Sequence, residues 1–76
     1  MKAFILFNIR AGEIADVVRH LGKIPQVKDV NMTFGPYDAV AIVHADSLDH
    51  LGKMLANEIQ PIAGIEETLT CLAVDL

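Results

Sequence analysis

Apolar residues fill both sides of the first strand-like segment of the chain. Over residues 3–9, odd and even positions fall on opposite sides of an extended chain. One side then carries Phe4 and Leu6, and the other carries Ala3, Ile5, Phe7 and Ile9. The pattern predicts a β-strand that is apolar on both faces.

From residue 12 the apolar spacing becomes helical. Carboxylates at Glu13 and Asp16 lie in the first predicted turn, where they interact favourably with the helix dipole. The apolar positions recur at i, i+3, i+4 and i+7, and they are Ile14, Val17, Val18 and Leu21. We therefore expect a helix that ends near residue 23, ahead of Pro25.

The rest of the chain predicts two more strands, a second helix and a last strand. Residues 27–33 and 38–45 are strand-like and are joined by a turn at Gly35-Pro36. Ser47 is a typical N-cap, and Pro61 ends the helix that follows. Residues 65–74 supply the last strand. The apolar stripe of the second helix is Leu48, Leu51, Leu55 and Ile59.

The order β-α-β-β-α-β predicts a single α+β domain over residues 1–76 with a ferredoxin-like fold. In this fold a four-stranded antiparallel sheet has two helices on one face. Two short helices cover only that face, yet several strands are apolar on both sides. Burying about five such side chains offers on the order of 10 kcal/mol. We therefore expect a homo-oligomer in which sheet packs against sheet.

Composition and charge narrow the function classes. Hydrophobic residues make up 53% of the chain, yet no apolar run reaches the length of a membrane span. Met1-Lys2 leads into a strand without a cleavage site, so we expect a cytoplasmic location. Six basic against ten acidic residues give a net charge of −4, which argues against direct nucleic-acid binding. The lone Cys71 cannot form an intrachain disulfide and is expected to fill core space.

The turn before the third predicted strand is the candidate ligand site. Gly35 permits positive φ, Pro36 fixes φ, and Tyr37 and Asp38 follow at the end of the sheet. A phenol and a carboxylate are thereby held in a rigid setting. The alternative is an ordinary hairpin turn in which Asp38 hydrogen-bonds its own backbone.

Four segments of the chain together carry a family pattern. They are Lys2-Ala3-Phe4-Ile5-Leu6, Ile24-Pro25-x-Val27-x-x-Val30, Gly35-Pro36-Tyr37-Asp38 and Gly64-Ile65-x-x-Thr68-x-Thr70. In this order they resemble the ligand-binding domain of the Lrp/AsnC transcription regulators, without the DNA-binding helix-turn-helix half. The resemblance implies sheet-mediated dimers, octamer or decamer rings, an amino acid bound between subunits, and no cofactor. It places ligand-binding residues at Gly35, Pro36, Tyr37, Asp38, Thr68 and Thr70.

Two departures from the family pattern lie in the turn. The family often has Thr immediately before the turn glycine, where this chain has Phe34, and Pro36 offers no N–H. On this resemblance we expect an effector-binding and assembly module, not an enzyme, that associates with full-length Lrp/AsnC regulators.

Other interpretations of the same residues stay open. Thr68 and Thr70 are also good strand formers, and Tyr37 can be an interface anchor. No histidine pair has metal-ligand spacing. A dimeric α+β barrel enzyme would need several polar groups in one enclosed pocket, drawn from Asn8, Tyr37, Asp38 and His44. A purely structural assembly module would leave no cavity at the subunit seam.

Overall fold

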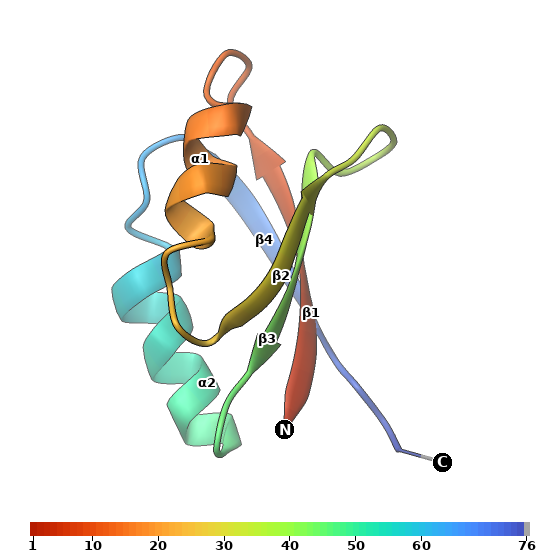
Figure 1. The fold of residues 1–76 in the computed structure, drawn as a ribbon, viewed down its shortest axis with the longest axis vertical. Helices are drawn as coiled ribbons and strands as arrows, with labels where there is room; N and C mark the ends of the chain where they lie inside the picture. Colours follow the sequence, from red (N-terminus) through yellow and green to blue (C-terminus); the bar gives the residue numbers. More distant parts are fainter. Residues whose placement is uncertain (76) are drawn as a thin grey trace.

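The computed structural model describes residues 1–75, which form a single sheet with the helices on one of its faces (Figure 1). The elements are β1 (Lys2–Ile9), α1 (Ile14–Leu21), β2 (Val27–Met32), β3 (Ala39–His44), α2 (Leu48–Met54), the π-helical segment η1 (Leu55–Ile59) and β4 (Ile65–Leu72). The four strands are antiparallel in the order β2-β3-β1-β4. This is the predicted ferredoxin-like fold.

The core lies between the helices and one face of the sheet. In β1 the burial alternates as the sequence predicts, with Ile5 and Phe7 fully buried and Phe4 and Leu6 only partly buried. Strand β3 repeats this alternation because it pairs with β1 residue by residue. The helices complete the core with Val17, Leu21, Leu51, Met54 and Ile59.

The second helix differs from the predicted one in its apolar stripe. Leu48 is exposed, whereas Met54 is buried, although the sequence pattern placed Leu48 in the stripe and omitted Met54. The reason is the change from α2 to the π-helical η1, which alters the angle between successive residues. Met54 and Ile59, five positions apart, then both face the core. The predicted stripe was therefore wrong at its first position.

The observed ends of other helices and strands differ from the predicted ends by a few residues. Helix α1 begins at Ile14 instead of residue 12, and β4 ends at Leu72 instead of residue 74. Gly12 has φ +87°, which is not helical and explains the later start. Within residues 1–75, no helix has the length and apolar character needed to cross a membrane.

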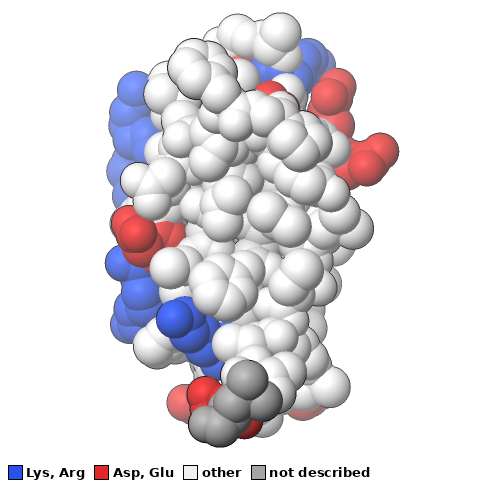
Figure 2. All heavy atoms as spheres, turned by 90° about the vertical axis from the view of Figure 1, so that its right-hand side faces the viewer, with Lys and Arg blue, Asp and Glu red and all other residues white. Residues whose placement is uncertain are grey.

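The face of the sheet that the helices leave uncovered is apolar at its centre. We call it the uncovered face; its centre consists of Phe4, Leu6, Val40, Ile42, Leu69 and Cys71, which pair across β3, β1 and β4. Figure 2 shows this side of the molecule, with most of the charged side chains toward its borders. Leu69 is 48% exposed. Cys71 is also exposed, so its expected place in the core was wrong. Position 71 pairs with Phe4 and therefore faces away from the helices.

Candidate ligand-binding site

The turn between β2 and β3 is closed by hydrogen bonds at its base. The Thr33 N–H donates to the Asp38 carbonyl over 3.0 Å, and the Thr33 hydroxyl donates to the Tyr37 carbonyl over 2.7 Å. Gly35 has φ +141°, a value that L side chains rarely adopt. The positive φ that Gly35 permits is thus confirmed, and Tyr37 and Asp38 follow the turn just before β3.

Asp38 is anchored to β1 through both its backbone and its side chain. Its N–H donates to the Phe7 carbonyl over 2.8 Å, and its Oδ2 accepts the Ile9 N–H over 2.7 Å. The β1–β3 ladder ends at the Phe7–Ala39 pair, so the Ile9 N–H has no strand partner on that side. The Asp38 carboxylate supplies that partner. The simpler hairpin interpretation, in which Asp38 bonds its own backbone, therefore misses this contact between strands.

A mostly apolar hollow of about 260 Å³ opens beside this carboxylate. Phe34 lies at the tip of the turn with its side chain fully exposed, and Met32, at the end of β2, is 60% exposed. Ile14 closes the hollow from the start of α1. Within residues 1–75, the hollow is lined by Ile14, Met32, Thr33, Phe34 and Asp38, and among these Asp38 carries the only charge. Within residues 1–75, Asp38 Oδ1 makes no hydrogen bond and is free for a ligand.

The threonines of β4 do not join this hollow within one chain. Thr68 pairs with Phe7 and Thr70 with Ile5, so both threonines lie beyond β1 as seen from the turn. Thr68 lines a different hollow of about 280 Å³, together with Glu66 and Glu67. Two neighbouring carboxylates make that hollow unfavourable for an anionic group. Any ligand shared by the turn and the threonines would need residues from two chains.

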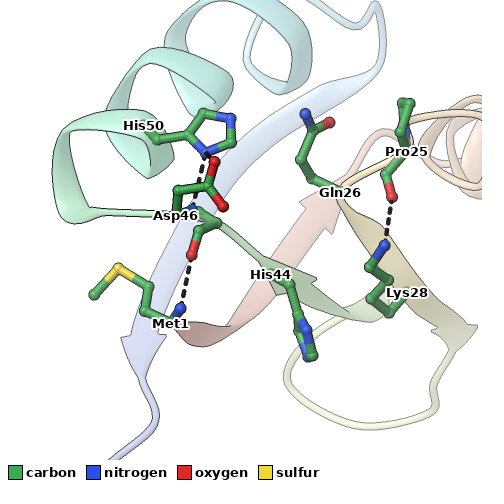
Figure 3. A pocket seen from close by; sticks show the side chains of 8 residues that line it. Met1, Pro25, Gln26, Lys28, His44, Asp46 and His50 are labelled. Atoms are coloured by element: carbon green, nitrogen blue, oxygen red, sulfur yellow. Dashed lines mark hydrogen bonds and ion pairs between the residues drawn. The ribbon is translucent and has the colours of Figure 1, made fainter.

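A larger hollow of about 520 Å³ lies where β3 ends and α2 begins (Figure 3). His50 Nδ1 accepts the Asp46 N–H over 3.0 Å, which leaves the ring proton of a neutral imidazole on Nε2. Lys28 bonds the Pro25 carbonyl over 3.1 Å. None of the predicted ligand residues lines this hollow. The sequence signal nearest to this hollow is the Ser47 N-cap, whose hydroxyl accepts the N–H of the lining residue His50. That cap predicts the start of a helix and does not predict a binding site.

Metal binding finds no support in residues 1–75. They contain no group of three or more His, Cys, Asp or Glu side chains able to hold a metal ion.

The polar groups that were considered for an enzyme site line different hollows. His44 lines the hollow of Figure 3, whereas Asp38 lines the hollow beside the turn, which is a separate cavity.

Comparison with known proteins identifies the family. The sequence pattern of the Lrp/AsnC ligand binding domain matches residues 2–75. The chain belongs to this family. The transcriptional regulator FL11 of Pyrococcus horikoshii, described as HTH-type, is 34% identical over 74 residues, which cover 97% of this chain and 48% of that protein. The chain thus spans about half the length of the curated relatives it matches.

Solved structures of other proteins share the fold of this chain. The crystal structure of FFRP-DM1 superposes with a TM-score of 0.92 at 32% identity, covering 96% of this chain and 97% of that one. A Neisseria meningitidis transcriptional regulator, NMB0573, was solved as a complex with L-Met. It superposes with a TM-score of 0.88 at 16% identity, covering 97% of this chain and 49% of that one, and shares the fold alone.

Proposed function

We propose that this Lrp/AsnC domain binds an α-amino acid effector at the Gly35–Asp38 turn. The observation that carries the proposal is the anchored Asp38 carboxylate, whose Oδ1 is free beside an apolar hollow. Anchoring lowers the ordering cost of binding, and a carboxylate forms a charge-assisted hydrogen bond with an ammonium group. Membership of a ligand-binding family supports the same function.

The other predicted residues have complementary roles in this proposal. Gly35 and Pro36 fix the course of the turn, and Tyr37, which is half-buried, is available at its exit. Thr68 and Thr70 enter the site from a neighbouring subunit. There the hydroxyl of Thr70, which lies outside the hollow lined by Glu66 and Glu67, donates to the effector carboxylate. This arrangement accounts for their separation from the turn within one chain.

The domain binds its ligand without transforming it. An enzyme site needs a nucleophile or an acid and base that converge on one cavity, and here Asp38 and His44 line separate hollows. The relatives that match along nearly the whole chain are described as transcriptional regulators. Binding therefore agrees better with the geometry and with the relatives than catalysis does.

The uncovered face carries self-assembly in this proposal, and its occupant is a second copy of the chain. Its apolar centre continues over β3, β1 and β4, while charged side chains lie mainly toward its borders. Such a distribution is typical of an interface with an apolar core and a polar rim. Dimers formed in this way assemble further into octamer or decamer rings, and the domain docks onto full-length Lrp/AsnC regulators.

A thermal-shift screen against the common amino acids tests effector binding. Ligand at one hundred times its dissociation constant adds about 2.7 kcal/mol, enough to raise the melting temperature by several degrees. We expect a selective shift that is lost in Asp38→Asn, which removes the charge but keeps an acceptor for the Ile9 N–H. Asp46→Asn, an exposed carboxylate away from the turn, should leave the shift intact. No shift with any amino acid would refute effector binding.

Light scattering with a charged substitution tests the assembly surface. Leu6 lies near the centre of the uncovered face, opposite Val40 and Leu69, so Leu6→Lys should reduce the measured mass. Ala56→Lys adds the same charge at an exposed position in η1 and serves as the control. Circular dichroism checks that both variants stay folded. A monomeric wild-type protein at micromolar concentration would contradict this part of the proposal.

A further inference from the structure

The hollow of Figure 3 gathers polar side chains from separate parts of the fold. They come from the start of β2, the end of β3 and the first turn of α2, and they include Gln26, Lys28, His44 and His50. Within residues 1–75, this hollow and the one beside Asp38 share no lining residue. The hollow is therefore a second place where a small molecule can be bound, independent of the turn.

Lys28 lies at a β-bulge that faces this hollow. The register between β2 and β3 shifts between Val27 and Asp29, so Lys28 is the extra residue on the β2 side. Bulges of this kind redirect a side chain and are frequent next to active sites. The Lys28 Nζ donates to the Pro25 carbonyl oxygen over 3.1 Å, which uses one of its three protons. A positive charge and two further N–H donors are thus held at the hollow.

The His50 ring supplies another donor of fixed identity. Its Nδ1 accepts the Asp46 N–H over 3.0 Å, which places the proton of the neutral ring on Nε2. The Asp46 carboxylate lies 3.8 Å from Nδ1, but its side chain is fully exposed, so water and salt screen its repulsion of an anion. Lys28 and His50 together therefore offer several donors and one cationic charge to a ligand.

Gln26 adds a buried acceptor that the chain leaves unsatisfied. Within the described residues, no group donates a hydrogen bond to the Gln26 Oε1, although this atom is buried. Most buried polar atoms in folded proteins have a partner, and an unpaired one lowers stability. A hydroxyl group on a ligand would provide the missing donor.

The charges around the hollow favour an anionic ligand more than those of the two hollows near the turn and β4. Asp38 lines the first of these, and Glu66 and Glu67 line the second. Here the charge of Lys28 offsets that of the exposed Asp46, although the whole chain has a net charge of −4. Phosphate groups accept several charge-assisted hydrogen bonds at once, which matches the donors of this hollow.

We propose that this hollow binds a small phosphate monoester with hydroxyl groups, of the sugar phosphate class. The phosphate oxygens accept hydrogen bonds from Lys28 Nζ and His50 Nε2, and a hydroxyl of the organic part donates to Gln26 Oε1. The volume of about 520 Å³ lies within the range of small-molecule sites and accommodates both parts. The domain then has a site for a phosphorylated metabolite in addition to the proposed effector site at the turn.

Isothermal titration calorimetry at fixed ionic strength tests this inference with three probes: glucose 6-phosphate, inorganic phosphate and glucose. We expect glucose 6-phosphate to bind about tenfold more tightly than inorganic phosphate, because it adds a hydrogen bond to a buried acceptor. Glucose, which lacks the anionic group, should bind most weakly.

Three variants separate the two contacts. Lys28→Gln should weaken both phosphate probes by about tenfold or more, because it removes a charged donor. Gln26→Met keeps the side-chain length and should lower the affinity for glucose 6-phosphate to that for inorganic phosphate, without lowering the free energy of unfolding. Lys23→Gln removes an exposed lysine that does not line the hollow, so it should leave both affinities unchanged.

The outcomes that contradict the inference are distinct. If the wild type binds neither phosphate probe, or if Lys23→Gln weakens binding as much as Lys28→Gln, the phosphate site is wrong. If the wild type binds the two phosphate probes equally, or if Gln26→Met keeps the preference, the contact between the hydroxyl and Gln26 is wrong. None of these results bears on amino acid binding at the turn, because the two hollows share no lining residue among those described.

Discussion

The hydrogen bond between the Ile9 N–H and the Asp38 carboxylate should contribute measurably to the stability of the fold. Asp38→Ala removes the carboxylate that accepts the Ile9 N–H over 2.7 Å, across 29 positions of sequence. Ile9 is only 4% exposed, so water has little access to replace the lost acceptor. Hydrogen bonds to charged groups contribute about 1.5–3 kcal/mol, and an unpaired buried donor costs a similar amount. We expect the free energy of unfolding to fall by about 1.5–3 kcal/mol.

Asp38→Asn separates the hydrogen bond from the charge. The asparagine oxygen still accepts from Ile9, so we expect a loss of about 1 kcal/mol, the difference between a charged and a neutral hydrogen bond. Urea unfolding followed by circular dichroism measures both losses, at one fixed protein concentration because oligomerisation is linked to stability. In a domain of this size the Asp38→Ala loss corresponds to a fall of roughly 6–24 °C in melting temperature.

The control and the refuting outcomes follow from the same geometry. Asp46→Ala removes a carboxylate whose side chain is fully exposed, so it should change stability by less than about 0.5 kcal/mol. If Asp38→Ala is as stable as the wild type, the contact with Ile9 is not structural. If Asp38→Asn is as unstable as Asp38→Ala, the negative charge and not the hydrogen bond holds β3 to β1.

Three further predictions concern two glycines and one helix cap, and the free energy of unfolding in urea measures each of them. Gly64→Ala should lower the free energy of unfolding by about 1–3 kcal/mol, because φ is +102° and the added Cβ would lie 3.1 Å from a methyl group of Val17. If this variant is as stable as the wild type, the loop at Gly64 can relax. Gly52→Ala should stabilise by about 0.5–1 kcal/mol, because position 52 lies inside α2 with open space around it, and a loss would contradict this. Ser47→Ala should cost about 0.5–2 kcal/mol by freeing the His50 N–H, whereas Ser47→Asn should retain most of the stability if capping is the cause.

The uncovered face could be anticipated because it depends on local pattern alone. In a strand the side chain at each position faces opposite to its neighbours, so Phe4 and Leu6 had to share one face once Ile5 and Phe7 faced the helices. The stripe of the second helix could not be placed as securely. Its residues depend on the π-helical segment η1, whose position the apolar spacing did not reveal.

Some features of the candidate site could be predicted from the sequence, and others became known only from the structure. The turn residues were predictable, because glycine and proline restrict the backbone where they stand. The Asp38–Ile9 contact and the approach of Ile14 to Phe34 were not, since they join residues far apart in the chain. The separation of Thr68 from the turn is likewise a result of strand order, with β1 lying between them.

The sequence by itself determined the order of elements, the family, the apolar character of both sheet faces and the conformation of the turn. These properties follow from side-chain periodicity and from residues that restrict φ, both of which act over a few positions. Only the tertiary structure decided which groups meet: the carboxylate that completes the β1–β3 edge, and the apolar hollow beside it. Contacts of this kind join residues far apart in the sequence. They depend on strand register and helix placement, which are set by the packing of the whole chain, so no short segment predicts them.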